Sequence, residues 1–264
     1  MDSFEEIFQR EWVRQGGAQS PLLVFHATID STSSDLRRRL EQGAPMETVV
    51  AADFQSSGRG RRGNTWHSHS GGNLYVSVAL RVDSPLEDNL PLVPLAAGIA
   101  AIDGLRDCAT CPATLKWPND VLVGDRKLAG ILCELPRPDL WPGLVIVGMG
   151  INIAEVDFPL EIRNKAISLQ GVAEENRGPL PHPAKLAASW ISRLHQWTLK
   201  KSFSNRNRIV TEWKKRAEPF GRRVRVGDVE GKTVDLTREG RLVIECKDGR
   251  REVVAGGVVE NMGD

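Results

Sequence analysis

Residues 114–135 read TLKWPNDVLVGDRKLAGILCEL, with a β-rich run on each side of the turn-forming pair Gly124-Asp125. Two such runs around a short turn predict a β-hairpin. Pro118 limits strand pairing before the hairpin, and Asn119-Asp120 favours a tight turn there. Lys127 interrupts an otherwise apolar strand, so this lysine either places a positive charge inside a pocket or reaches solvent from the strand end.

Strand and helix patterns continue on both sides of this hairpin. Apolar runs of strand length are bounded by turn signals or followed by apolar residues at helical spacing. This pattern predicts an α+β fold in which a mixed β-sheet has helices packed on one side. The predicted strands cover residues 22–29, 48–55, 73–82 and 144–153, and the predicted helices cover residues 30–43, 92–107 and 183–200.

The chain changes character after Trp213. Between Phe220 and Glu260, short β-rich runs are separated by glycine-containing turns, which predicts a small all-β barrel of about 45 residues. We therefore expect three parts: an N-terminal helical preamble (1–20), a large domain (21–217) and a small β-domain (218–264).

The composition is that of an ordinary globular protein. The chain has 264 residues, and its 35 Lys and Arg nearly balance its 34 Asp and Glu. A net charge of +1 argues against a protein that mainly coats nucleic acid, because such proteins are strongly basic. No apolar run approaches the roughly 20 residues that span a bilayer, and the acidic N-terminus does not read as a signal peptide.

The four cysteines are too few for a dense disulfide framework, which indicates a reducing cytoplasm. Cys108 and Cys111 have the spacing of metal ligands, but no second pair or nearby histidine completes a site. We therefore expect no metal site built from these thiols and no association with membranes.

Residues 58–66 read GRGRRGNTW and concentrate glycine and arginine without any acid. Glycine lets a backbone approach a ligand closely, and arginine N–H groups match phosphate oxygens. The GxxxxGK[ST] pattern of a Walker A loop is missing. On these residues alone, the stretch is compatible with a phosphate cradle, a nucleic-acid grip or a solvated loop.

Two further signals are equally open. Gly148 and Gly150, in the apolar run VGMGIN, mark either the approach of a ligand or tight packing of a helix against the sheet. Ser31-Thr32-Ser33 follows a predicted strand and either caps the next helix or offers hydroxyls to a ligand.

The order and spacing of these motifs resemble those of the biotin protein ligase family. QSSGRGRRGNTW is followed by GGNLYVS, KWPNDVLVGDRKLAGIL and VGMGIN, and the resemblance covers about residues 22–260. The start of KLAGIL seven residues beyond Asp120 makes its pairing with KWPND specific. The resemblance implies a catalytic domain like those of class II aminoacyl-tRNA synthetases and biotin ligases, followed by an SH3-like barrel.

Members of this family use ATP and Mg²⁺ to convert biotin into biotinyl-5′-AMP, and then transfer biotin to a lysine of a carrier protein. The resemblance therefore implies an ATP-dependent, AMP-forming ligase. Its protein partner would be a biotin carboxyl carrier protein, a subunit of acetyl-CoA carboxylase or of a related carboxylase. Members occur as monomers and as dimers, so a homodimer stays open.

The resemblance also assigns roles to residues. Lys127 and Arg61 would be the catalytic pair, with Lys127 stabilising charge on the reacting carboxylate and α-phosphate. The GRGRRG loop would close over the ligands, with Arg59 and Arg61 facing biotin and the phosphate, and Arg62 facing the polyphosphate or the adenylate. Trp66 would pack beneath the loop. The expected ligand-binding residues are Ser31, Thr32, Ser33, Gln55, Gly58, Arg59, Gly60, Arg61, Arg62, Trp66, Lys116, Asn119, Lys127, Gly130, Gly148, Gly150 and Asn152.

Within this set, the residues divide between the two substrates. Lys116, Asn119 and Asn152 match the nucleotide side, and Asp120 fits a place near the metal or the incoming lysine. The biotin side would consist of hydrogen-bonding groups and closely packed glycines: Ser31, Thr32, Gln55, Gly130, Gly148 and Gly150.

Three positions depart from the family pattern. Ser33 stands where the family often has asparagine, and Asn64 stands where the loop commonly has a basic residue. Some members place a tryptophan against adenine, where this chain has Lys165-Ala166-Ile167-Ser168-Leu169. We therefore expect adenine to be held differently here.

Bifunctional members carry an N-terminal winged helix that binds DNA, whereas this chain reaches its first predicted strand at residue 22. We therefore expect no DNA binding. Three alternatives remain: a lipoate ligase or octanoyl transferase of related fold, a nucleic-acid-binding module, and an inactive scaffold that binds biotin carriers.

Overall fold

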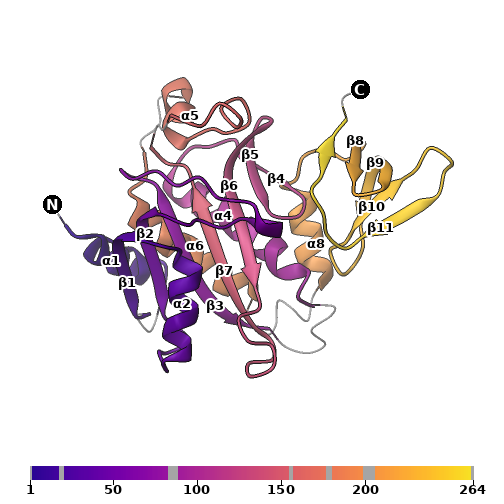
Figure 1. Cartoon of the computed structure of the whole chain (residues 1–264). Coiled ribbons are helices and arrows are strands. Elements are labelled where there is room, and N and C mark those ends of the chain that lie inside the picture. Colours follow the sequence, from indigo (N-terminus) through magenta and orange to yellow (C-terminus); the bar gives the residue numbers. More distant parts are fainter. Residues whose placement is uncertain are drawn as a thin grey trace.

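The computed structural model describes residues 2–17, 21–82, 89–154, 157–176, 180–198 and 206–262. A large mixed sheet and a smaller antiparallel sheet form its two parts (Figure 1). The α+β class expected from the sequence is confirmed. Among these residues, no helix is both long and apolar enough to cross a membrane.

The large sheet has the strand order β1-β2-β3-β7-β6-β5-β4. β1 and β2 are parallel, and the other neighbours are antiparallel. The hairpin expected around Gly124-Asp125 is formed by β5 and β6, and Gly124 has a φ of +57°, which favours glycine. The strands are β1 (Leu23–Ile29), β2 (Val49–Gln55), β3 (Leu74–Arg81), β4 (Thr114–Lys116), β5 (Asp120–Val123), β6 (Arg126–Glu134) and β7 (Leu144–Ile151).

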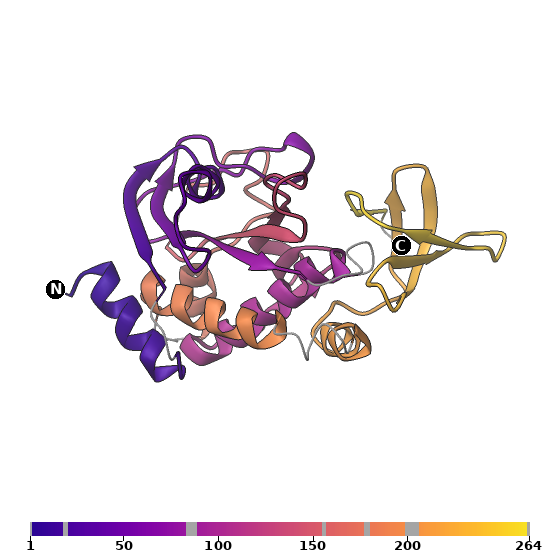
Figure 2. The same ribbon diagram turned by 90° about the horizontal axis from the view of Figure 1, so that it is seen from below.

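Most of the helices cover one face of this sheet, as expected. Figure 2 shows α1 (Phe4–Arg14), α4 (Leu92–Cys108) and α6 (Pro183–Thr198) together on that side. α4 and α6 approach closely because Gly104 carries no side chain: a Cβ there would lie 3.1 Å from the backbone nitrogen of Trp190. α8 (Arg206–Lys214) packs against α4, and α5 (Leu169–Asn176) follows the large sheet.

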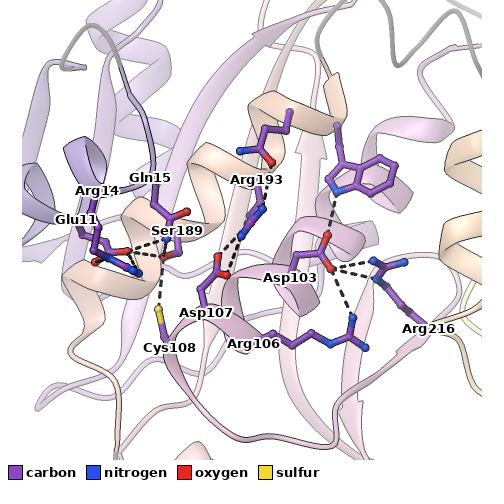
Figure 3. Close-up of polar contacts among 12 residues, drawn as sticks. Glu11, Arg14, Gln15, Asp103, Arg106, Asp107, Cys108, Ser189, Arg193 and Arg216 are labelled. Atoms are coloured by element: carbon purple, nitrogen blue, oxygen red, sulfur yellow. Dashed lines mark hydrogen bonds and ion pairs between the residues drawn. The ribbon is translucent and has the colours of Figure 1, made fainter.

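Ion pairs and hydrogen bonds tie these helices together (Figure 3). Asp103 of α4 accepts from Trp197 Nε1 at 3.1 Å and from two nitrogens of Arg216 at 3.0 and 3.2 Å. Asp107, one turn later, forms a two-bond pair with Arg193 at 2.8 and 2.9 Å. The carbonyl of Arg216 also accepts from the N–H of Leu115 in β4 at 2.8 Å, so this network reaches the hairpin region of the sheet.

α1 accounts for most of the expected helical preamble and is part of the core. Ser3 and Glu6 form a capping box at its start, and Phe8 and Trp12 are buried. Phe4 stacks on Phe25 of β1 with 4.3 Å between ring centroids. The helix therefore seals the outer edge of the apolar layer under the sheet.

Because Phe8 has no exposed surface, replacing it with alanine should leave a cavity in that layer. We expect Phe8→Ala to lower the free energy of unfolding by about 3 kcal/mol in urea denaturation. Val13→Ala is the matched control, because Val13 lies on the same helix and is 66% exposed. Equal stabilities of the two variants would show that α1 does not pack as described.

The C-terminal part is a five-stranded sheet with the order β11-β10-β9-β8-β12. It meets the large domain where Trp117 Nε1 donates to the carbonyl of Gly240 at 3.0 Å. The boundary expected at residues 217/218 stays a prediction. The strands are β8 (Arg223–Val226), β9 (Val229–Leu236), β10 (Leu242–Glu245), β11 (Arg251–Val254) and β12 (Glu260–Asn261).

The opposite face of the large sheet is covered differently. There α2 (Thr32–Glu41) packs over β2, β3 and β7, with Leu36 and Leu40 against Val50, Ala79 and the apolar residues at the start of β7. Figure 2 shows α2 on the side away from α4 and α6. Beyond the N-terminus of α2 this face carries serine and glycine instead of bulky side chains, which leaves room for a cleft.

Candidate functional site

A cleft of about 970 Å³ opens at this end of the sheet. Its walls come from the N-terminus of α2, the Gly/Arg loop (residues 58–66), β6, β7 and residues 257–261 of the C-terminal part. It brings together all but one of the residues predicted to bind ligands: Ser31, Thr32, Ser33, Gln55, Arg59, Gly60, Arg61, Arg62, Trp66, Lys116, Asn119, Lys127, Gly130, Gly148, Gly150 and Asn152.

Gly58 is the exception, because it does not line the cleft. Its carbonyl accepts from the N–H of Trp66 at 2.9 Å, and a Cβ at this position would lie 2.6 Å from the Trp66 carbonyl oxygen. Gly58 therefore closes the base of the Gly/Arg loop. It does not line the cleft, so the prediction that it contacts a ligand is not supported by its position.

The floor of the cleft holds a buried chain of hydrogen bonds. Gln55 Oε1 accepts from the N–H of Thr32 at 2.8 Å and from its hydroxyl at 3.2 Å. Ser77 Oγ lies 2.8 Å from Thr32 Oγ1 and 2.9 Å from Ser33 Oγ. A hydroxyl has one proton to donate, so Ser77 donates to Thr32 and Ser33 donates to Ser77. This direction leaves acceptor capacity at Ser33, where the chain begins.

Ser31 stands at the N-cap position of α2, but its side chain makes no capping hydrogen bond. The residue is only 4% exposed and lines the cleft. Of the two roles left open by the sequence, the geometry therefore favours a hydroxyl offered to a bound molecule. A serine hydroxyl can donate one hydrogen bond and accept others from such a molecule.

Gly130 and Gly150 face each other across β6 and β7, and the indole of Trp66 lies on both. A Cβ at Gly130 would be 2.7 Å from Trp66 Cζ3, and one at Gly150 would be 2.6 Å from Trp66 Cε2. Trp66 Nε1 is buried without a hydrogen-bond partner. Trp66 thus packs beneath the loop, as expected, and a molecule that contacts these two glycines must displace it.

Lys127 points into the cleft from the start of β6. Its Nζ is 2.7 Å from Asp120 Oδ1 and 5.4 Å from the centroid of the Trp66 ring. The lysine side chain is 35% exposed. The sequence left open whether this lysine places its charge inside a pocket or reaches solvent from the strand end. The structure favours the pocket, because Lys127 lies among the residues that line the cleft.

The Gly/Arg loop is a small hairpin in its own right. Gly60 N–H donates to the carbonyl of Asn64 at 2.7 Å, and Arg59 and Thr65 form a β-bridge. The tip is a short 3₁₀ turn, η1 (Arg61–Gly63), in which Arg62 has a φ of +55°. A side chain in this left-handed region is uncommon and marks a constrained tip.

The three arginines of this hairpin have different partners. Arg59 pairs with Glu134 at 2.9 Å. Arg61 donates to Asn119 Oδ1 at 3.1 Å and to the carbonyl of Gly257 at 3.4 Å. Arg62 reaches the carbonyl of Gly256 at 3.5 Å. The tip therefore contacts the C-terminal part while the base is held by β6.

Burial lowers the pKa of Arg61 below its ordinary value, and the charge of neighbouring Arg62 lowers it further, while Asp120 opposes the shift. A guanidinium stays protonated at neutral pH in spite of such a shift. The direction shows that the half-buried charge of Arg61 is not fully compensated by the protein. It is suited to meeting an anionic group.

The predicted nucleotide-side residues, Lys116, Asn119 and Asn152, also line the cleft. Asn119 Nδ2 donates to the carbonyl of Ile131 at 2.7 Å, and Asn152 Nδ2 donates to the carbonyl of Ile167 at 3.1 Å. Both amides therefore also hold the local backbone. Lys165 and Ala166 line the cleft beside Lys127, whose N–H donates to the Lys165 carbonyl at 2.7 Å.

Sequence reasoning missed several residues of this site. Ser77 is the buried centre of the floor network, and its signal was a single hydroxyl inside the apolar run LYVSVAL. Phe158 and Ile162 line the rim, and Glu134 fixes Arg59. Ser77 ends the motif GGNLYVS, whereas Phe158, Ile162 and Glu134 belong to no motif, so only the fold could place those three.

The chain is similar to known proteins along most of its length. Residues 25–152 match the biotin/lipoate A/B protein ligase family, and residues 220–260 match the biotin protein ligase C terminal domain. A biotin--[acetyl-CoA-carboxylase] ligase of Mycobacterium tuberculosis is 34% identical over 249 residues, covering 89% of this chain and 87% of that protein. The bifunctional ligase/repressor BirA of Bacillus subtilis is 30% identical over 245 residues, covering 89% and 73%.

A solved structure shows the same arrangement. The biotin protein ligase from Aquifex aeolicus in complex with biotin and ATP superposes with a TM-score of 0.74 and 27% identity, covering 91% of this chain and 99% of that one.

Proposed function

The chain belongs to the biotin protein ligase family, and on this premise we propose that it activates biotin with ATP and joins it to a lysine of a biotin carrier protein. The observation that carries this proposal is the cleft itself. One hollow gathers buried hydroxyls, side-chain-free glycines, three lysines and the three arginines of the Gly/Arg loop. A small polar molecule and a phosphate ester could bind there side by side.

In the first step, a carboxylate oxygen of biotin attacks the α-phosphorus of ATP. A new oxygen–phosphorus bond forms, the bond to the bridging oxygen breaks, and pyrophosphate leaves. Lys127 and Arg61 would place cationic donors where negative charge develops on the carboxylate and the phosphate. Asp120, at 2.7 Å from Lys127 Nζ, orients that ammonium group.

In the second step, the amine of a carrier lysine attacks the activated carbonyl. The amide bond forms, AMP leaves, and the amine gives up a proton. Asp120 lines the cleft and would be the group that accepts this proton. Before this step the mixed anhydride must be kept from water, and the loop hairpin with Trp66 supplies a cover.

Magnesium belongs to the same proposal. Within the described residues, no group of three or more His, Cys, Asp or Glu could hold a metal ion. Mg²⁺ does not need such a group, because it keeps several waters and binds through one or two carboxylates together with substrate phosphates. Asp120 is the residue that we propose for this contact, and the ion would supply charge neutralisation of the polyphosphate.

The partner and compartment follow from the same premise. We propose the biotin-carrying subunit of acetyl-CoA carboxylase as the protein substrate, in the cytoplasm. All four cysteines are free, which fits a reducing compartment. A homodimer remains a proposal, tested by light scattering with and without biotin and ATP.

Transfer of labelled biotin tests this function directly. The purified chain is mixed with ATP, magnesium and an isolated carrier domain, and label on the carrier is measured. We expect labelling that disappears when the acceptor lysine is replaced with arginine. Labelling by lipoate or octanoate instead of biotin would favour the related ligases and transferases of this fold.

Gly148→Ala tests the assignment of the cleft floor. The added Cβ would lie 2.9 Å from Ser33 Oγ and 3.2 Å from Ser77 Oγ, so the buried hydroxyls must shift. We expect the KM for biotin to rise about tenfold, because misplaced hydroxyls lose hydrogen bonds to the ligand. Gly171→Ala is the control, since its Cβ would meet only ordinary contacts at 3.7 Å and beyond. An unchanged KM for biotin in Gly148→Ala would show that biotin does not bind at the floor of the cleft.

A further inference from the structure

Glu134 lies at the end of β6 and joins two segments that are far apart in the sequence. Its Oε2 accepts from Arg59 Nη2 at 2.9 Å, and its Oε1 lies 3.6 Å from Arg37 Nη2. Arg59 belongs to the loop hairpin, and Arg37 belongs to α2, whose N-terminus carries the hydroxyls of the cleft floor. One carboxylate therefore connects the cover of the cleft to its floor.

This arrangement is partly shielded from water. The side chain of Glu134 is 20% exposed, and those of Arg37 and Arg59 are 33% and 36% exposed. Arg37 Nε and Arg59 Nε are both buried without a hydrogen-bond partner. Two guanidinium groups thus share one counter-charge, and without Glu134 they would repel each other at close range.

The other side-chain attachments of the hairpin are longer. Arg61 reaches Asn119 at 3.1 Å, and the contacts of Arg61 and Arg62 with the C-terminal part are 3.4 and 3.5 Å. These contacts end on neutral oxygens, whereas Glu134 offers a charge, and charge-assisted hydrogen bonds are shorter and stronger. The pair with Glu134 is therefore the main polar anchor of the hairpin base.

We propose that Glu134 is a positioning residue that holds Arg59, and with it the Gly/Arg hairpin, over the cleft. It acts through Arg59 and does not touch the reacting atoms. The inference rests on the proposed function, since the molecule retained by the hairpin would be the biotinyl-adenylate. Its physical content, the anchoring of the hairpin by Glu134, can be measured without any catalysis.

Glu134→Gln keeps the size of the side chain and removes its charge. We expect the bound adenylate to dissociate about tenfold faster, because a shielded charge pair acts mainly on the rate of release. The kcat of pyrophosphate exchange should change less than about threefold, since Lys127 and Arg61 stay in place. Asp139→Asn is the matched control: this carboxylate follows in the next loop, is 64% exposed and pairs only with Arg137 among the contacts described.

A double-mutant cycle separates positioning from a general structural effect. If Glu134 acts through Arg59, Glu134→Gln should add nothing to the dissociation rate in an Arg59→Gln background. If the two substitutions instead raise the dissociation rate independently, so that their fold-changes multiply in the double variant, the proposal is wrong. It is also wrong if adenylate dissociates equally fast from Glu134→Gln and Asp139→Asn. Arg37→Gln should have a smaller effect than either, because its contact with Glu134 is longer.

Limited trypsin digestion without ligands keeps the two claims separate. Trypsin cleaves after arginine, and the hairpin tip carries Arg61 and Arg62. We expect Glu134→Gln to be nicked in residues 58–66 about fivefold faster than the wild-type chain and Asp139→Asn, because local opening becomes easier. If Glu134→Gln and the wild-type chain are cleaved at equal rates, Glu134 does not anchor the hairpin, even if the chain makes adenylate. If Glu134→Gln is cleaved faster but the wild-type chain makes no adenylate, the anchor is supported and the proposed function is contradicted.

Discussion

Replacing Lys127 with methionine should lower the rate of adenylate formation at least about a hundredfold, while the fold stays intact. In the proposed reaction, the lysine supplies the charge that the reacting carboxylate and phosphate must share, and its Nζ lies 2.7 Å from Asp120 Oδ1. Methionine is an unbranched side chain one atom shorter than lysine, so it can still pack against Trp66, but it carries no charge and donates no hydrogen bond. Single-turnover formation of adenylate, followed by rapid quench, measures the effect on the chemical step alone.

Stability should change little in this variant. Lys127 and Asp120 are 35% and 27% exposed, and ion pairs with such access to water contribute about 1 kcal/mol or less. Lys247→Met is the control, because Lys247 is exposed on a turn of the C-terminal sheet. If Lys127→Met forms adenylate as fast as this control, Lys127 takes no part in the reaction.

Arg61→Ala should release the activated intermediate instead of stopping its formation altogether. Arg61 is half-buried, contacts both Asn119 and the C-terminal part, and carries a charge that the protein does not fully compensate. Its loss removes a cation from the cleft and one attachment of the hairpin tip. We expect adenylate dissociation to rise about a hundredfold, as for the loss of a charged hydrogen-bonding partner.

The released adenylate provides the readout. It should react with lysines of a bystander protein such as serum albumin, so labelled biotin appears on a protein that is no natural acceptor. Arg250→Ala is the control, since Arg250 lies on the exposed β10–β11 turn. No bystander labelling, together with wild-type retention of adenylate, would mean that Arg61 does not hold the intermediate.

The parts of the fold that depend on local sequence were predictable. Residues Gly124-Asp125 form the turn of a hairpin, because glycine accepts the φ of +57° found at position 124. This glycine can be recognised from the sequence alone. The cleft residues could be named because GRGRRG, KWPND and KLAGIL are contiguous motifs, and the fold brings them to one hollow. The role of each named residue stays a prediction until the variants are measured.

The parts that depend on distant contacts were not predictable. α2 packs on the face of the sheet opposite to α4 and α6, although its apolar residues, Leu36 and Leu40, show only that one side of it is buried. Glu134 belongs to no motif, and its partners Arg37 and Arg59 lie 97 and 75 residues before it in the chain. Gly58 belongs to the motif yet serves the loop itself, because the backbone of Trp66 fills the space beside it.

The measurement that tests the central claim most directly is exchange of labelled pyrophosphate into ATP, with magnesium and without any carrier protein. If the cleft activates biotin, exchange requires biotin, saturates with it, and does not respond to lipoate or octanoate. A folded sample that shows no biotin-dependent exchange would contradict the account, and the Gly/Arg loop would then need another ligand.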